Sequence, residues 1–338
     1  MKLIKTEDAV GQVLCHDMTQ IIPGEYKGAR FRKGHIVAQE DIPVLLSMGK
    51  ENLYIFEMDE NMLHENDAAE ILCKICKGQN ISRGEVKEGK IELTAEIDGL
   101  FTIDREKLNA INSIEELMIA ARKGDTPVRK GDKLAGTRVI PLVIDKTKLQ
   151  QAEEFANDAP IMNVLPYTLT TAAVITTGSE VYHGRIEDRF TPVLFEKLNA
   201  FGITVTEHIT VDDGIDNITK AIDSVKGKAD MILCTGGMSV DPDDNTPGAI
   251  KQSGAQIVTY GAPVLPGAMF LLGYYKDNTP IMGLPGCVMY AKATIFDLVL
   301  PRIAAGVKLN KADFVAYGEG GLCLSCEKCT YPHCPFGK

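Results

Sequence analysis

The segment Ala229-Asp230-Met231-Ile232-Leu233-Cys234-Thr235-Gly236-Gly237 decides the fold class. Its apolar run is short enough for a buried strand, and the Gly-Gly pair predicts a loop directly after that strand. Stretches with helical spacing of apolar residues stand on either side, at 215–225 and after Thr246. This alternation predicts an α/β fold in which helices cover a parallel sheet.

The same alternation extends over 171–306. We expect further strands at 172–177, 203–209 and 281–284, a helix at 188–201, and a long helix that runs from Pro285-Gly286 to about Gly306. Ligands of open α/β sheets bind beyond the carboxyl ends of the strands. The sequence therefore offers three candidate binding loops, at 178–187, 235–244 and 284–287.

The first 157 residues read as a smaller α+β region. A helix is expected at 106–122, and a polar helix at 145–157 followed by Asp158-Ala159-Pro160 is typical of a linker. We therefore predict an N-terminal region at 1–157, a three-layer sheet-and-helix domain at 158–310 and a cysteine-rich tail at 311–338.

Composition narrows the function classes. The 338 residues are 45% hydrophobic and 24% charged, which predicts a multidomain globular chain, and the net charge of −10 argues against a nucleic-acid partner. The most apolar late segment, 288–300, contains Lys292 and Asp297 and is too short for a membrane span. The N-terminus turns acidic before any apolar stretch, so we expect a cytoplasmic protein with reduced thiols.

The loop at 235–247 is the most informative stretch. Adjacent glycines allow close backbone approach to a ligand, and Asp241, Asp243 and Asp244 could hold Mg²⁺ on a phosphate. The Ser239 hydroxyl and the N–H groups of the helix near Thr246 would meet the anionic oxygens. The alternative is an Asp-rich turn that caps a helix, which composition alone favours.

Four separated motifs together carry a family resemblance: Thr176-Thr177-Gly178-Ser179-Glu180, Thr235-Gly236-Gly237-Met238-Ser239-Val240, Leu265-Pro266-Gly267 and Gly283-Leu284-Pro285-Gly286. With Gly184 and Asp188 in the expected order, 171–306 resembles the molybdopterin-binding domain shared by molybdopterin adenylyltransferases and molybdopterin molybdenumtransferases.

The resemblance implies a cleft for molybdopterin or adenylated molybdopterin, with Mg²⁺ on its phosphates. It implies catalytic roles for Asp188, Asp241, Asp243 and Asp244, with Asp244 as a Mg²⁺ ligand. The ligand-binding residues that it implies are Thr177, Gly178, Glu180, Thr235, Gly236, Gly237, Ser239, Pro266, Gly267, Pro285 and Gly286.

Three positions depart from the family pattern. Gly-Asp-Glu reads Gly178-Ser179-Glu180, Ser-Val-Gly-Asp reads Ser239-Val240-Asp241-Pro242, and Pro-Gly-Asn-Pro reads Pro285-Gly286-Cys287-Val288. The N-terminal region resembles the molybdenumtransferases only in the pieces 9–14 and 31–54, whose order looks rearranged. Pterin or nucleotide binding is therefore better supported than molybdate insertion.

Four cysteines close the chain. Cys323, Cys326, Cys329 and Cys334, followed by Pro335, give C-x₂-C-x₂-C-x₄-C-P, one residue longer than the bacterial ferredoxin run. A [4Fe–4S] cluster is the first choice and Zn²⁺ the second, with His333 as a competing ligand. A flexible reduced tail is the third interpretation.

Other polar residues carry weaker hypotheses. Cys73 and Cys76 could form a redox pair, although two buried residues on one helical face is the favoured interpretation. His183 could contact a phosphate or be merely exposed. His64-Glu65-Asn66 could form a polar site, but a helix cap near Asn66 or Asp67 is favoured.

Three functions remain open. The leading hypothesis is an enzyme of molybdenum cofactor biosynthesis, similar to a molybdenumtransferase, that takes a pterin or nucleotide and possibly molybdate. The motifs at 210–213 and 243–246 are similar to those of competence-damage-inducible, Mg²⁺-dependent nucleotide pyrophosphatases. A non-catalytic cofactor carrier or sensor is the third, and the family resemblance also implies a homo-oligomer.

Overall fold

The computed structural model describes residues 2–22, 25–55, 61–239, 241 and 244–338. Internal contacts divide the chain into two compact units. Unit 1 comprises 1–97, 101–124 and 129–164, and unit 2 comprises 98–100, 125–128 and 165–338. Among the described residues no helix combines the length and apolar character that a membrane crossing needs.

Unit 2 is built on a six-stranded sheet. Its strands are β14 (Thr171–Thr177), β15 (Thr204–Val211), β16 (Met231–Thr235), β17 (Gln256–Tyr260), β18 (Leu271–Tyr274) and β19 (Pro280–Leu284). The order is β15-β14-β16-β19-β18-β17, in which the first four strands are parallel and the last two are antiparallel to their neighbours. The predicted parallel sheet is confirmed, and β17 and β18 are strands that the sequence analysis missed.

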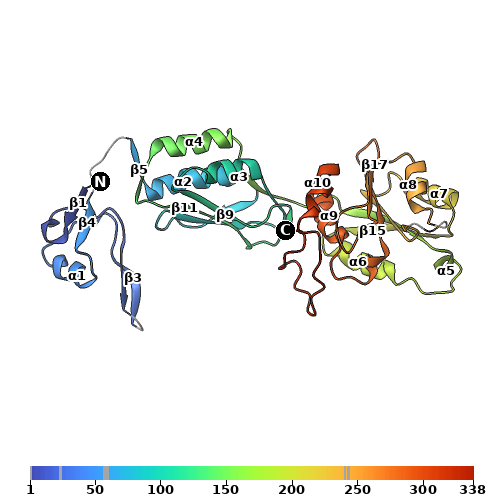
Figure 1. Cartoon of the computed structure of the whole chain (residues 1–338), viewed down its shortest axis with the longest axis horizontal. Coiled ribbons are helices and arrows are strands. Elements are labelled where there is room, and N and C mark those ends of the chain that lie inside the picture. Colours follow the sequence, from blue (N-terminus) through green and yellow to red (C-terminus); the bar gives the residue numbers. More distant parts are fainter. Residues whose placement is uncertain (1, 23–24, 56–60, 240, 242–243) are drawn as a thin grey trace. The chain divides into compact units, whose positions relative to one another are not determined.

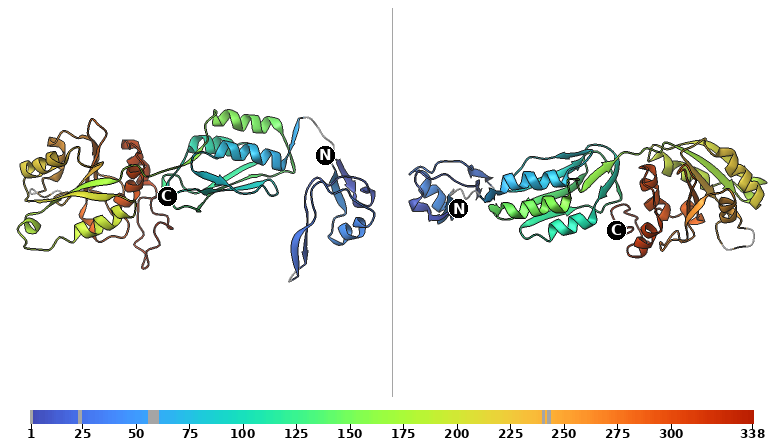
Figure 2. Two further views of the ribbon diagram at one scale, coloured as in Figure 1. Left: turned by 180° about the vertical axis from the view of Figure 1, so that it is seen from behind. Right: turned by 90° about the horizontal axis from the view of Figure 1, so that it is seen from above.

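Helices cover both faces of this sheet (Figures 1 and 2). They are α5 (Ser179–Tyr182), α6 (Phe190–Asn199), α7 (Ile215–Val225), α8 (Thr246–Gln252), α9 (Ile295–Ala304) and α10 (Lys311–Val315), with short 3₁₀ turns at Gly286–Met289 and Ala316–Gly318. Alternate residues of a strand face opposite ways. Leu233 therefore packs in one core with residues of α6 and α9, whereas Ile232 packs in a second core with α7 and α8. The predicted three-layer α/β architecture is confirmed.

Helix α9 begins later than the sequence predicts. Asp297 Oδ2 accepts a 2.8 Å bond from Thr294 N, and Phe296 N donates to Thr294 Oγ1 over 3.2 Å. This capping box starts the helix at Ile295. The expectation of one continuous helix from Pro285-Gly286 is wrong, because a 3₁₀ turn and this cap separate the two segments.

Unit 1 contains several small sheets. Its elements are β1 (Lys2–Lys5), β2 (Met18–Ile22), β3 (Tyr26–Phe31), β4 (Asn52–Ile55), β5 (Met62–His64), β6 (Ile81–Arg83), β7 (Lys90–Ala95), β9 (Leu117–Ala121), β11 (Lys133–Val139) and β12 (Val143–Asp145), with α1 (Asp41–Ser47), α2 (Glu65–Cys76), α3 (Arg105–Asn112) and α4 (Lys146–Ala156). Strands β8 (Gly99–Ile103) and β13 (Met162–Leu165) lie at the boundaries of the two units, and β10 (Thr126–Val128) belongs to unit 2. Helices α2, α3 and α4 lie over one face of the β6-β7-β11-β9 sheet (Figure 1).

The helix predicted at 106–122 is wrong in its second half. The helix stops at Asn112, whose side chain donates to Ile119 O over 2.9 Å and accepts from Ile119 N over 2.8 Å. Glu116 adopts a positive φ of 74°, which a helix cannot accommodate. The chain therefore turns back into β9, where Ile119 pairs with Thr137.

Two hypotheses about α2 are decided by its packing. Asn66 N donates to His64 Nδ1 over 3.2 Å, so the polar triplet at 64–66 is a helix cap, with His64 itself as the capping residue. Cys73 and Cys76 are 2% and 0% exposed, which confirms the favoured interpretation of buried core residues. Burial raises the pKa of both thiols, which disfavours reactive thiolates.

The polar helix expected as part of a linker is α4. Leu149, Ala152 and Ala156 are buried on one of its faces, and the helix packs on α2 and α3 within unit 1. The division of contacts falls eight residues beyond this helix, between Val164 and Leu165.

Candidate functional site

The candidate binding loops of unit 2 meet at one edge of the sheet. The register pairs Thr176 of β14 with Thr235 of β16, and Thr235 with Leu284 of β19. Parallel strands in this register end side by side, so the loops that begin at 178, 236 and 285 leave the same edge. Strand β15 ends there too, because Val211 pairs with Thr177. The structure thus brings together the loops that the sequence analysis proposed.

The Gly236-Gly237 pair packs tightly against its neighbours. Gly236 has a φ of +85°, and a Cβ atom there would lie 2.3 Å from Thr177 O. A Cβ on Gly237, with φ +54°, would lie 3.0 Å from Thr246 Oγ1. Only glycine combines this conformation with so little space, so the backbone of the loop is held against the end of β14.

Two threonine side chains hold the Gly236-Gly237 loop in place. Thr246 Oγ1 donates to Gly236 O over 2.9 Å and lies 3.3 Å from Thr177 Oγ1. Thr246 N also donates to Gly237 O over 3.2 Å. Thr246 is fully buried at the first residue of α8, so it ties the glycine pair to that helix. The sequence analysis named Thr246 only as part of a helix start and missed this function.

Thr235 carries an unsatisfied hydroxyl at the same edge. Its side chain is 1% exposed, and Oγ1 has no hydrogen-bond partner among the described residues. Leaving such a group unpaired costs roughly 1–3 kcal/mol. A buried hydroxyl in this state is consistent with a ligand that supplies the missing partner.

Asp188 is engaged in local hydrogen bonds. Its carboxylate accepts from Phe190 N over 2.9 Å, from Thr191 N over 3.0 Å and from the Thr191 hydroxyl. Burial opposes ionisation of this carboxyl, but the bonds from Thr191 and Phe190 outweigh burial and lower its pKa. Thr191 in turn lies 3.1 Å from Thr176 Oγ1, which is also 3.1 Å from His208 Nε2. Asp188 therefore anchors the start of α6 to the end of β14.

The first loop contains Gly178 and Glu180. Gly178 is buried with a φ of +139°, whereas the side chain of Glu180 is exposed and folds back over the glycine. Ser179 N donates to Asp213 Oδ2 over 2.8 Å. His183 is exposed, and its Nε2 lies 3.5 Å from Asp212 Oδ2.

The sequence analysis named Asp212 and Asp213 only within the 210–213 motif and did not include them among the candidate site residues. They follow directly after β15, and the edge position of that strand places them beside the first loop. The position of an acid pair at a strand end was the sequence signal that could have identified them.

Only part of the acidic turn can be placed. Asp244 N donates to Asp241 O over 3.0 Å, and Asp241 N donates to Asp244 Oδ2 over 3.2 Å. Asp243 lies outside the described residues. Tyr260 OH donates to the carbonyl of Met238 over 3.1 Å, while burial and the charge of Asp244 raise the tyrosine pKa. In the described part of the turn, Asp241 and Asp244 are joined by these two hydrogen bonds, as expected for an Asp-rich turn. Both side chains carry carboxylates that could serve as metal ligands.

The remaining predicted residues lie in three places. Ser239 is exposed on the loop after β16, and Pro285-Gly286 follows β19 at the same edge. Pro266 and Gly267 instead contact α9: Ile295 N donates to Pro266 O over 3.2 Å, and a Cβ on Gly267 would lie 2.4 Å from Ile295 Cγ2.

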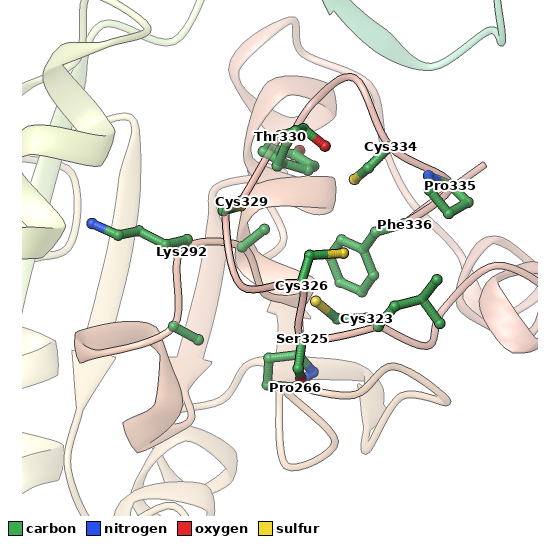
Figure 3. Close-up of a pocket in the computed structure, with 14 residues that line it drawn as sticks. Pro266, Lys292, Cys323, Ser325, Cys326, Cys329, Thr330, Cys334, Pro335 and Phe336 are labelled. Atoms are coloured by element: carbon green, nitrogen blue, oxygen red, sulfur yellow. The ribbon is translucent and has the colours of Figure 1, made fainter.

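The cysteines of the tail form a separate group in unit 2. Cys323 and Cys334 are half-buried, Cys326 and Cys329 are exposed, and all four are free thiols that line one pocket (Figure 3). No three His, Cys, Asp or Glu side chains of the described ranges surround a common point where a metal ion could sit.

Comparisons with known proteins match two segments of the chain to protein families. Residues 173–305 match the family described as "Probable molybdopterin binding domain", and residues 3–57 match a "Domain of unknown function (DUF8806)". A "Putative competence-damage inducible protein" of Bacillus thuringiensis is 35% identical over 94 residues, which cover 28% of this chain and 23% of the relative.

Two further similarities are longer or structural. A "Molybdopterin molybdenumtransferase" of Staphylococcus epidermidis is 24% identical over 306 residues, with 84% of this chain and 66% of the relative covered. The solved structure of the molybdopterin biosynthesis enzyme MoaB from Thermus thermophilus is 19% identical, with a TM-score of 0.33 over 41% of this chain and 98% of that one. This chain thus spans under a quarter of the Bacillus thuringiensis relative and just under two thirds of the Staphylococcus epidermidis relative. Residues 173–305 belong to the molybdopterin-binding domain family.

Proposed function

We propose that this chain acts in molybdenum cofactor biosynthesis by binding molybdopterin or adenylated molybdopterin with Mg²⁺ at the strand-end loops, and by supporting molybdate insertion. The observation that carries the proposal is the unpartnered Thr235 hydroxyl beside a tightly held Gly-Gly loop, within a molybdopterin-binding domain. In this proposal the backbone of the glycine loop lets anionic oxygens approach closely, and Thr235 offers a buried hydrogen bond.

Mg²⁺ in this proposal arrives with the phosphates of the ligand. The ion is usually held by one or two carboxylates together with substrate phosphates, and it keeps several waters. Asp244 and Asp241 are close enough to each other to hydrogen bond within one turn, and Asp212 and Asp213 lie at the same sheet edge. Bound Mg²⁺ would neutralise phosphate charge in an acidic protein, while Thr235 and the loop backbone orient the ligand.

The test combines binding and turnover. Adenylated molybdopterin, molybdate and Mg²⁺ should give mature cofactor, and Asp244→Asn should reduce the rate and the Mg²⁺ dependence. Asp277→Asn is the matched control, because Asp277 caps a turn between β18 and β19, at the opposite edge from the carboxyl end of β19. Absence of molybdopterin binding by the folded protein would refute the proposal. Tight binding without conversion would instead identify a carrier or sensor.

A second candidate is Mg²⁺-dependent hydrolysis of a nucleotide pyrophosphate. It is favoured by the 35% identity to the competence-damage relative and by the placement of the 210–213 motif, in which Asp213 bonds the first loop. Release of a mononucleotide from ADP-ribose, lost in Asp213→Asn, would support it.

We also propose self-association of the chain, which sedimentation at two concentrations tests.

A further inference from the structure

The loop that carries the four cysteines is closed at its base. Leu265 N donates to Gly321 O over 2.8 Å, and Cys323 N donates to Leu265 O over 2.8 Å. Beyond the cysteines, Gly337 N donates to Gly320 O over 2.9 Å. The residues before and after the cysteine run are therefore joined directly, and the run between them forms a loop rather than a free tail.

Two aromatic side chains hold the loop on unit 2. Phe336 is 3% exposed and packs in the same core as α9, and its ring lies 6.2 Å from that of Tyr331 in an edge-to-face arrangement. The Tyr331 hydroxyl donates to Asp297 O, in α9, over 3.1 Å. The loop is thus anchored on unit 2 at its base and near its end, which lowers the entropy cost of gathering four ligands.

The loop surrounds a pocket of about 270 Å³ that all four cysteines line. Figure 3 shows the sulfurs of Cys323, Cys326 and Cys334 pointing into the space that the loop encloses, beside Phe336. A single water needs only about 10–15 Å³ of such space, so the pocket has room for a group of several atoms. The remaining wall of the pocket is largely apolar.

We propose that this pocket binds a [4Fe–4S] cluster through the thiolates of Cys323, Cys326, Cys329 and Cys334. Four cysteine thiolates are the ligand set of such a cluster, and the first two of the three spacings match a ferredoxin run, as does the proline after the last cysteine. The roomy pocket and its apolar wall suit a polynuclear group that spreads its irons between the sulfurs.

A single Zn²⁺ suits the pocket less well. Structural zinc draws four ligands to about 2.0–2.3 Å from one point. The pocket, at about 270 Å³, is large for a single ion, and the exposed His333, the competing zinc ligand, does not line it. Binding of the cluster does not depend on which molecule the strand-end loops bind. The cysteine loop contacts Pro266 and α9 rather than the Gly236-Gly237 loop.

The test uses the full chain purified without oxygen. We expect a brown protein with a broad visible absorption band, and iron and acid-labile sulfide in equal amounts. A colourless protein that contains zinc would overturn the proposal, as would a metal-free protein that binds neither iron nor zinc. Molybdopterin binding is measured on the same sample, so failure of one proposal is distinguishable from failure of the other.

Matched variants assign the ligands. Cys326→Ser and Cys329→Ser change exposed positions, so we expect both proteins to fold but to lose the visible band and the sulfide. Cys287→Ser removes a thiol outside the pocket, and Ser325→Ala removes a pocket hydroxyl, and both should keep the cluster. Retention of full iron and sulfide in Cys326→Ser and Cys329→Ser would contradict the proposed ligand set.

Discussion

The Oγ1 atoms of Thr177 and Thr246 lie 3.3 Å apart, although 69 residues separate them in the chain. Thr177 is the last residue of β14 and Thr246 is the first of α8. Their contact places the Gly236-Gly237 loop between two fixed hydroxyls, because Thr246 also donates to Gly236 O. The shape of the candidate site therefore depends on a contact between the end of a strand and the start of a helix that lie far apart in the sequence.

The tight space at Gly236 predicts a large cost for Gly236→Ala. Alanine at this position would have to adopt a φ of +85°, and its Cβ would lie 2.3 Å from Thr177 O. We expect a loss of about 2–4 kcal/mol in the free energy of unfolding of unit 2, measured by urea denaturation. Gly254→Ala is the control, because its φ of +89° is nearly the same but nothing lies within 4 Å. That control should lose only about 1 kcal/mol, and equal losses in the two variants would contradict the steric argument.

Removing the unpartnered hydroxyl of Thr235 should affect folding stability and ligand binding in different ways. Thr235→Val keeps the shape of the side chain but removes a buried Oγ1 that has no partner among the described residues. The free energy of unfolding should stay the same or rise by up to about 1–3 kcal/mol, while molybdopterin affinity falls. Thr246→Val should instead lower stability, because it leaves Gly236 O without its donor. Isothermal titration and thermal unfolding of both variants check this pair of outcomes.

The capping bonds of Asp188 predict an acid-dependent stability. Its pKa is lowered in the folded chain, because the hydrogen bonds from Thr191 and Phe190 outweigh the opposing effect of burial. A lowered pKa stabilises the fold above the unfolded value of about 3.9, and the contribution is lost as the pH falls through the lower folded value.

Asp188→Asn tests this contribution. Asparagine keeps an accepting oxygen and caps helices about as well as aspartate, so the substitution removes mainly the charge and should cost about 0.3–1 kcal/mol at neutral pH. Urea unfolding at pH 7 and at successively lower pH should show the variant and the parent chain converging in strong acid. A constant difference at every pH would show that the charge of Asp188 contributes nothing.

The buried ring at the end of the chain predicts that the tail stabilises unit 2. Phe336 is 3% exposed in the core shared with α9, so Phe336→Ala should cost about 3–5 kcal/mol. Leu324→Ala, at a residue 65% exposed, should cost under about 0.5 kcal/mol. Limited proteolysis should release the tail in the first variant only, and equal protection in both would argue against the packing of Phe336.

The periodicity of apolar residues predicted most of the central sheet. The run at 231–234 is apolar throughout because β16 is buried on both faces, which is why its strand could be recognised. Strand β17 was missed because an antiparallel edge strand carries mixed residues: Thr259 is buried whereas Tyr260 is exposed. Strand β18 lies inside the sheet and is buried, but it has only four residues and contains Gly273, so its apolar signal is short. The helix predicted at 106–122 was wrong because a side-chain bond between Asn112 and Ile119 overrode the local pattern.

The sequence by itself determined the chemistry of this protein: the glycine pair, the acids after the strands and four closely spaced cysteines are all visible in it. Only the tertiary structure decided which of these meet. The register of β14, β16 and β19 aligns the strand ends, and the pairing of Leu265 with Leu322 closes the cysteine loop. Such contacts join residues far apart in the chain, and spacing along a sequence encodes only local geometry.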